Sequence, residues 1–483
     1  MTKSGLRNST TKDFENGRLG DKRLTKRLLH IATTMAANPS ASLPQIFIEK
    51  QDLDNTYSFL SNDGVEESAL WDAHREGTVK RCKDYKEILV IHDTTEFAFD
   101  DFGFERQYLS QISTNRQGFY GHFSIAVSNE INPMPLGTLN AIHFVHKEQV
   151  GEETAEWWNE RGGLLENEHD RWLQGCRSAD RALQGVECQI IHLCDREGDS
   201  YELMGSLIED RQQFVIRCSS RDRRCRDQKR KIVSLESLLL EAQHGVETRE
   251  ILVPSTKTKA GIKKAKNTPL IEVRKESLHR RLTNVQIRWR SVTMDRQRLK
   301  NVPRDLTVNV VEVFEHVVPE GFEAVSWILL TTLPINTEED AWKIVDIYRH
   351  RWMIEEFFKA TKTGASYEKR QITTAHGLLN ILAISAAIAA DLLLMRACDR
   401  NHPHREATWI ADADFVTMVK ILTPQKQFSK IPTVHEVLDA VARYGGHRKS
   451  NGPPGWQILY RGFVKILHAL QVARLFGHFP STA

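Results

Sequence analysis

The stretch TEEDAWKIVDIYRHRWMIEEFFKATK, residues 337–362, is the segment around which the predicted fold is built. Thr337, followed by Asp340 three residues later, is a helix-start signature, and no glycine or proline follows before Gly364. Apolar residues recur through the stretch at helical spacing. The pattern predicts one long helix.

One side of this predicted helix is polar. At about 100° per residue, its polar side chains fall within roughly 80° of one another. They are Tyr348, Arg351, Glu355, Lys359 and Lys362. Taken alone, this stripe also fits a solvated face with ion pairs between residues four apart, so other segments must decide between a surface and a site.

Two apolar runs that end in aspartate favour a site. Residues 87–93 (EILVIHD) and 188–195 (CQIIHLCD) are short and rich in β-branched residues, as expected of buried strands. A carboxylate at such a place must find partners or bind a cation. Asp93, Asp195 and Glu355 therefore predict a three-carboxylate site for a divalent metal. Oxygen-only ligands favour magnesium or manganese over zinc.

Three motifs carry a resemblance to a known family. They are IHDTT at residues 91–95, LCDREGDSY at 193–201, and the spacing Y-x2-R-x3-E-x6-K from Tyr348 to Lys362. Together with LGDKRLTKRL at 19–28, ARYGG at 442–446 and GPPGW at 452–456, they resemble the DDE cut-and-paste transposases of the insertion-sequence-four type. The resemblance covers most of the chain and is loosest over the last hundred residues.

The resemblance implies an α/β fold with a ribonuclease-H-like catalytic core and an inserted β subdomain, flanked by helical domains. Residues 1–70 would form the N-terminal helical domain that binds DNA ends, and residues 71–370 the catalytic domain, with the insert at about 218–320. Residues 371–483 would form a C-terminal helical domain that dimerises around paired DNA ends.

The resemblance also implies a mechanism on double-stranded DNA. Asp93 would bridge two Mg²⁺ or Mn²⁺ ions, with Asp195 and Glu355 completing their ligands. The expected steps are a nick at the transposon end, a hairpin, its opening, and transfer of the 3′ end into target DNA. Phosphate and backbone contacts would come from Tyr348, Arg351, Lys359 and Lys362, and from Arg217, which aligns with a DNA-contacting arginine of the family.

Trp327 lies in the predicted strand 324–332. A tryptophan on a strand usually belongs to the core. Its distance from Glu355 along the chain is the same as in the family, which implies that the indole stacks on a base flipped out of the duplex.

Near the N-terminus, an amphipathic basic helix is predicted at residues 20–30. One side carries Lys22, Arg23, Lys26 and Arg27, and the other carries Leu24, Leu28 and Ile31. A solvated surface has the same pattern, but the resemblance places DNA-end recognition here.

The rest of the catalytic region is predicted to form strands of a sheet with helices packed on it. Residues 119–128 and 135–145 predict antiparallel neighbours of the Asp93 strand, and residues 152–180 predict helices. The interval from Asp195 to Glu355 is too long for one connection. Within it, strands are expected at 213–217, 248–253 and 284–289, and the basic loops 221–231 and 257–266 would neutralise phosphates.

Composition limits the number of domains and the cellular compartment that the chain can have. A chain of 483 residues with 27% charged and 40% hydrophobic residues is long enough for two or three globular domains, and its net charge is only +3. Seven cysteines without a CxxC pair, and a start without an apolar segment, indicate a reducing cytoplasm, with the protein on nucleoid DNA when it acts. The apolar run 378–395 is interrupted by polar residues and predicts a buried helix, with no membrane partner.

Two other classes fit the same motifs. A metal-dependent nuclease of this fold would cut DNA without joining it. A DNA-binding regulator without catalysis would have little use for three buried carboxylates.

Overall fold

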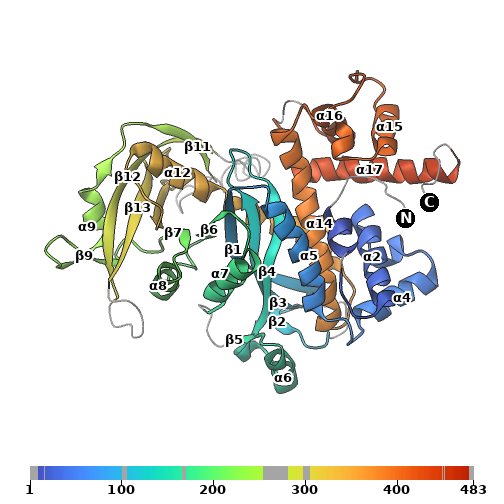
Figure 1. Cartoon of the computed structure of the whole chain (residues 1–483), viewed down its shortest axis with the longest axis horizontal. Helices are drawn as coiled ribbons and strands as arrows, with labels where there is room; N and C mark the ends of the chain where they lie inside the picture. The colour runs from blue at the N-terminus through green and yellow to red at the C-terminus, as the bar shows by residue number, and fades with distance from the viewer. Residues whose placement is uncertain are drawn as a thin grey trace. The chain divides into compact units, whose positions relative to one another are not determined.

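The computed structural model describes residues 9–15, 17–100, 106–165, 170–253, 281–296, 305–448, 450 and 452–477. The chain divides into two compact units, one comprising Met1–Gln189 with Trp352–Ala483 and the other comprising Ile190–Arg351. The strands form a mixed sheet with flanking helices (Figure 1), so the predicted α/β class is confirmed.

The sheet of the first unit is built on three long antiparallel strands, β1 (Glu87–Asp100), β3 (Arg116–Ser128) and β4 (Pro135–His146). Short strands β2 (Ser110–Ser113) and β5 (Leu164–Leu165) pair with β3 and β4. The predicted neighbours of the Asp93 strand are confirmed. The predicted end of that strand is wrong, because β1 continues to Asp100 and leaves Asp93 in mid-strand opposite Phe123. The continuation TTEFAFD supplies β-branched and aromatic residues that extend the pairing.

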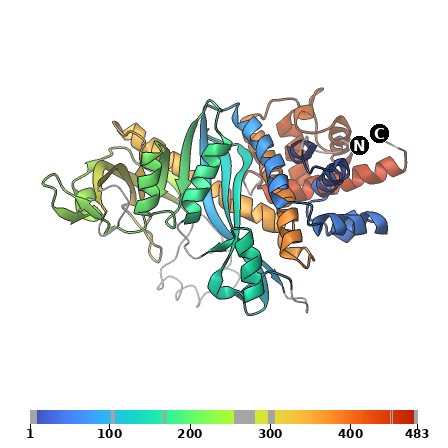
Figure 2. The same ribbon diagram turned by 60° about the horizontal axis from the view of Figure 1, so that its bottom comes forward.

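Helices cover both faces of this sheet (Figure 2). The helix α7 (Asp170–Ala182) lies on the face to which His92 points, with Cys176 Sγ 3.5 Å from His92 Nε2. The opposite face packs against α5 (Glu67–Cys82), whose Trp71 ring contacts Phe123. The helices expected in residues 152–180 are confirmed as α6 (Glu152–Glu160) and α7.

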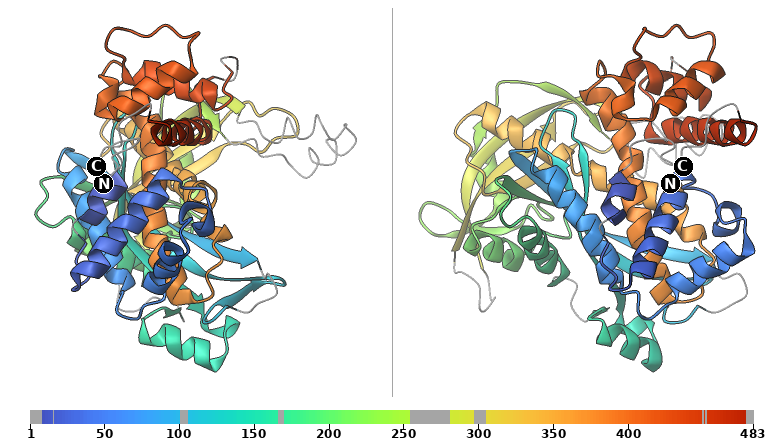
Figure 3. Two further views of the ribbon diagram at one scale, coloured as in Figure 1. Left: turned by 90° about the vertical axis from the view of Figure 1, so that its right-hand side faces the viewer. Right: turned by 45° about the vertical axis from the view of Figure 1, so that its right-hand side comes forward.

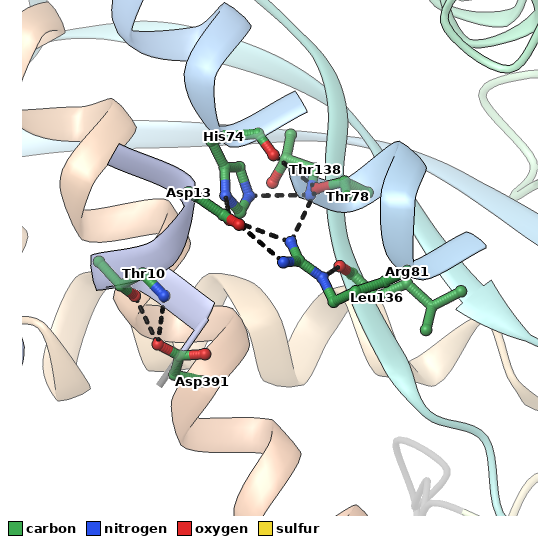
Figure 4. A network of polar contacts seen from close by, with 8 residues as sticks. All are labelled: Thr10, Asp13, His74, Thr78, Arg81, Leu136, Thr138 and Asp391. Carbon is green, nitrogen blue, oxygen red and sulfur yellow. Dashed lines mark hydrogen bonds and ion pairs between the residues drawn. The ribbon is translucent and has the colours of Figure 1, made fainter. Parts of the chain in front are cut away.

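The N-terminal helices pack on the same unit. They are α1 (Ser9–Glu15), α2 (Lys22–Ala37), α3 (Leu43–Ile46) and α4 (Lys50–Leu60). A buried polar network fastens α1 (Figure 4): Asp13 accepts hydrogen bonds of 2.8 Å from Arg81 Nη1 and from His74 Nδ1, and Thr10 N–H donates to Asp391 Oδ2 at 3.0 Å. Backbone N–H of Thr138 donates to His74 Nε2, which fixes the ring so that Nδ1 faces Asp13.

The helix α14 (Ala375–Asn401) runs through the first unit and carries Asp391. It is long and apolar enough to cross a membrane, but 94% of its most apolar window is buried inside the protein, so the predicted buried helix is confirmed. The last helices, α15 (Ala413–Leu422), α16 (Val434–Tyr444) and α17 (Trp456–Leu475), gather beside one end of α14 (Figure 3).

The strands of the second unit follow the order β6-β7-β14-β13-β12-β8-β9. Its main strands are β6 (Gln189–Cys194), β7 (Gln213–Arg217), β12 (Arg281–Asp295), β13 (Asp305–Glu315) and β14 (Ser326–Thr331). The shorter strands are β8 (Arg224–Arg226), β9 (Ile232–Ser234), β10 (Gln243–His244) and β11 (Arg249–Val253). The helices are α8 (Tyr201–Glu209), α9 (Leu235–Leu240) and α12 (Glu338–Arg349). Each strand expected in this region is present, and Asp195 directly follows β6 as expected.

The predicted single helix at residues 337–362 is wrong. The chain forms α12, then α13 (Trp352–Lys359), then one π-helical turn (Ala360–Gly364). The capping box at Thr337 is confirmed. After α12 the backbone makes hydrogen bonds to the third preceding residue instead of the fourth: His350 N–H donates to Ile347 O, and Arg351 N–H donates to Tyr348 O. No glycine or proline marks this break in the sequence. Because α12 and α13 are separate helices, helix periodicity cannot relate Tyr348 and Arg351 to Glu355.

Candidate catalytic and DNA-contact residues

Asp93 lies on the β1 face that α13 covers. Its side chain shares a face with that of Phe123, its cross-strand partner, and Phe123 contacts the rings of Phe357 and Phe358 at centroid distances of 5.8 and 5.7 Å. Only 9% of Asp93 is exposed, and its Oδ1 accepts a 2.8 Å hydrogen bond from Thr94 N–H. The helix that carries Glu355 therefore packs on the face of the sheet that carries Asp93.

The two adjacent glutamates of α13 have different surroundings. Glu356 forms a two-pronged ion pair with Arg396 of α14, and Arg396 Nη1 donates to Glu356 Oε1 at 2.8 Å. Glu355 is half-buried. The neighbouring helix thus holds Glu356 as a packing contact.

Two lysines follow on the same segment. Lys359 ends α13 and is exposed, whereas Lys362 lies half-buried on the π-helical turn. The Lys362 ammonium lies 3.8 Å from Glu368 and 5.6 Å from the centroid of the Phe97 ring. Lys359 is therefore open to solvent, and Lys362 is held in place from two sides.

Asp195 belongs to the second unit, where it is half-buried after β6 and its Oδ1 accepts a 2.8 Å hydrogen bond from Glu197 N–H. Its charge acts on Tyr348 of α12. Burial raises the pKa of the Tyr348 phenol, Asp195 raises it further, and Arg351 and Arg217 oppose the rise. These four residues, predicted from separate stretches of sequence, thus lie close enough to interact electrostatically.

Arg217 is the most constrained cation of this group. It hydrogen bonds to Tyr348, and within the described part of the chain its buried Nε has no hydrogen-bond partner. Burial lowers the pKa of Arg217, and the positive charges of Arg196 and Arg351 lower it further. Like charges held together in this way favour an anionic ligand such as phosphate.

Arg196 is a member of this group that sequence reasoning missed. It is exposed and directly follows Asp195 in the LCDREGDSY motif, so the motif itself contained the signal. Two other missed residues, Arg396 and Glu368, are recognisable only from tertiary contacts.

Trp327 lies on β14 against Tyr348, with ring centroids 6.2 Å apart and an interplanar angle of 59°. Arg217 pairs with Leu329 across β7 and β14, so Arg217 and Trp327 share a face of the sheet. The indole is half-buried, unlike a core tryptophan such as Trp342, which is 1% exposed. An accessible ring beside the arginines leaves a face available for stacking.

In the basic loop 221–231, Lys229, Arg230 and Lys231 are exposed, and contact of the loop with phosphates stays a prediction. The loop contains β8, and its arginines are bound within the second unit: Arg221 pairs with Glu312, Arg223 with Asp199, and Arg226 with Asp295 at 2.6 Å and Asp305 at 2.9 Å. These carboxylates lie far from the loop in sequence, so the loop sequence alone does not show that its arginines form ion pairs. The second loop, 257–266, lies outside the described residues.

The basic helix at the N-terminus is confirmed as α2, with Leu28 and Ile31 buried and Leu24 half-buried. Lys22, Arg23 and Lys26 are exposed. Arg27 instead turns to α4, where it pairs with Asp52, which also bonds His30 Nε2 at 2.8 Å. The solvent-facing cations are therefore the first three.

Asp93, Asp195 and Glu355 remain the predicted metal ligands. All offer carboxylate oxygens, and each aspartate already has one backbone N–H on a single oxygen, which orients the carboxylate. Such a donor set suits Mg²⁺ or Mn²⁺.

Comparison with protein families gives two matches. Residues 7–65 match a family described as Transposase DNA-binding, and residues 168–390 match one described as Transposase DDE domain. The first match contains the exposed cations of α2, and the second contains Asp195, Glu355 and the arginines Arg196, Arg217 and Arg351. Asp93 lies outside both.

Proposed function

We propose that this chain, which carries a transposase DNA-binding domain and a DDE transposase domain, is a transposase that cuts the ends of its transposon and joins them to target DNA. The two family matches support a DNA transposase in general terms. The finer proposal is an enzyme of the insertion-sequence-four type, resembling the transposon-five transposase, with a ribonuclease-H-like core and the β-rich residues 218–320 as its insert.

The observation that supports the proposal lies in the second unit, where the carboxylate of Asp195 and the arginines Arg217 and Arg351 all act on Tyr348. In the first unit, Asp93 and the α13 helix of Glu355 share one face of a sheet. Carboxylates that hold cations, together with arginines that hold a phosphate, are the two components that phosphoryl transfer on DNA requires.

In the proposed mechanism, Asp93, Asp195 and Glu355 hold two Mg²⁺ or Mn²⁺ ions. When bound, the ions activate a water or a 3′-hydroxyl and stabilise the leaving oxygen. Arg351 and Arg217 bind the phosphate through charge-assisted hydrogen bonds, and Tyr348 is kept neutral by its raised pKa, so that its hydroxyl donates to a phosphate oxygen. Lys359 and Lys362 contact the DNA backbone.

Two parts of the chain bind the DNA end in this proposal, the helix α2 and Trp327. Lys22, Arg23 and Lys26 on α2, with Arg27 behind them, give the N-terminal domain a basic surface for the end sequence. Trp327 stacks on a base extruded during a hairpin step. Two copies of the chain act on paired ends, through the C-terminal helices, in the cytoplasm.

A joining assay tests the proposal. A labelled fragment of the DNA flanking the reading frame, with its short inverted repeat, is incubated with the protein, Mg²⁺ and a plasmid. Label covalently attached to the plasmid supports transposition. Cleaved fragments without attachment indicate a nuclease, and binding without cleavage indicates a regulator.

A further inference from the structure

Glu368, which is outside the predicted motifs, lies at a meeting point of three donors in the first unit. It belongs to a short 3₁₀ turn (Tyr367–Lys369) after the π-helical turn that carries Lys362. Its Oε1 accepts from Ala98 N–H at 3.2 Å and lies 3.8 Å from Lys362 Nζ, and its Oε2 lies 4.0 Å from Arg116 Nη2. The carboxylate thus joins the Lys362 segment to β1.

A second contact fixes the lysine from β1. The Lys362 ammonium lies 5.6 Å from the centroid of the Phe97 ring, a cation–π distance. Phe97 is on the same face of β1 as Asp93, because side chains alternate along a strand and the register with β3 is unbroken between them. The position of Lys362 is therefore set by contact with β1, the strand that carries the proposed metal ligand Asp93.

The backbone around Glu368 is held by buried contacts. Tyr367 is fully buried, its ring meets Phe97 edge-on at 5.1 Å, and its hydroxyl donates to Leu378 O at 2.9 Å. Ser366 has a φ of 50°, a left-handed conformation that surrounding contacts must hold, and its Oγ donates to Ser40 O at 3.0 Å. A fixed carboxylate of this kind can position a flexible lysine.

We infer that Glu368 is a positioning residue for Lys362: it holds the ammonium against Phe97 so that the lysine meets the DNA phosphate at a set place relative to Asp93. This rests on the proposed function, in which Lys362 contacts the DNA backbone. In the absence of the carboxylate, the four-carbon side chain of Lys362 samples many rotamers, and the phosphate must order it during the reaction.

A double-mutant cycle separates positioning from folding. Glu368→Gln keeps an oxygen for Ala98 N–H and removes the charge that attracts Lys362, and Lys362→Met keeps the length of the side chain without the ammonium. We expect Glu368→Gln to slow single-turnover nicking by roughly tenfold to a hundredfold with end binding unchanged. In the Lys362→Met background, the same change is expected to have no further effect. An equal slowing in both backgrounds would overturn the inference. Lys369→Gln, at the exposed next residue, is the matched control.

A second measurement does not depend on cleavage. Acetylation of lysines by a soluble reagent, followed by mass spectrometry, is expected to show Lys362 reacting more slowly than Lys369, and faster in Glu368→Gln than in wild type. Unchanged Lys362 reactivity in Glu368→Gln would contradict the inference. Wild-type protein that fails to nick transposon ends would instead contradict the proposed function, and the labelling would still decide the role of Glu368.

Discussion

Arg396 of α14 binds both carboxylate oxygens of Glu356, with Nη1 donating to Oε1 at 2.8 Å, and both side chains are largely buried, with 15% and 19% exposed. The pair commits the second glutamate of the IEEFF segment to helix packing. Helix angles along residues 337–362 no longer distinguish the glutamates, because the chain breaks between α12 and α13. The Arg396 contact makes that distinction independently.

The first prediction concerns these two glutamates. Glu355→Gln should lose Mg²⁺-dependent nicking by a factor of about a thousand or more, because losing a ligand costs several kcal/mol of barrier. Glu356→Gln should retain most of the nicking rate. It should lower the free energy of unfolding by about 1 to 3 kcal/mol, since Arg396 loses its charged partner.

Paired nicking assays at fixed salt, with circular dichroism and thermal melting, measure both effects. A folded Glu356→Gln protein that does not cut, beside an active Glu355→Gln protein, would reverse the assignment of the metal ligand.

The second prediction concerns the aspartates. Asp93→Ala and Asp195→Ala should each abolish nicking and leave gel-shift binding of the transposon end nearly unchanged, because the DNA-binding cations lie on other side chains. If either variant nicked at a tenth of the wild-type rate, that aspartate would not be a metal ligand.

Trp327 gives the third prediction. Trp327→Ala should leave the first nick largely intact and slow hairpin formation or opening, since stacking worth about 1 to 3 kcal/mol acts only on an extruded base. Step-resolved cleavage of an end-labelled duplex shows which step changes. Equal slowing of every step, or loss of folded protein, would indicate that the ring only packs against Tyr348.

The fourth prediction is a pH dependence of stability from the network that fastens α1. Burial alone would raise the pKa of Asp13, but the bonds from His74 and Arg81 outweigh it, so the folded pKa is below the ordinary value. The stabilisation is therefore complete above the unfolded pKa of about 3.9 and is lost as the pH falls through the lower folded value.

Asp13→Asn should accordingly lower the free energy of unfolding by about 3 to 5 kcal/mol at pH 7, as expected for a broken buried ion pair. The difference from wild type should shrink below about pH 4. Urea midpoints at several pH values measure it, with Asp54→Asn, at an exposed residue of α4, as control. A difference that stays constant from pH 6 to strongly acidic conditions would show that the charge of Asp13 contributes nothing.

Local patterns predicted several of the elements correctly. The runs around Asp93 and Asp195 predicted strands, the Leu28 and Ile31 spacing predicted α2, and the capping box at Thr337 predicted the start of α12. These features depend on residues close together in sequence, which is why they can be read from one chain.

Features set by tertiary contacts could not be predicted. The break after Arg349 has no glycine or proline to announce it. The arginines of 221–231 appear solvated until Asp295, Asp305 and Glu312 reach them from other strands. The metal set Asp93, Asp195 and Glu355 remains a prediction from motif and chemistry.

The most direct test of the central claim is transfer of 3′-labelled transposon ends into a supercoiled plasmid with Mg²⁺, comparing wild type with Asp195→Asn. The account predicts label covalently joined to the plasmid by wild type, none joined by Asp195→Asn, and equal end binding by both. Joining that persists in a folded Asp195→Asn protein, or wild-type cleavage without any joined product, would contradict it.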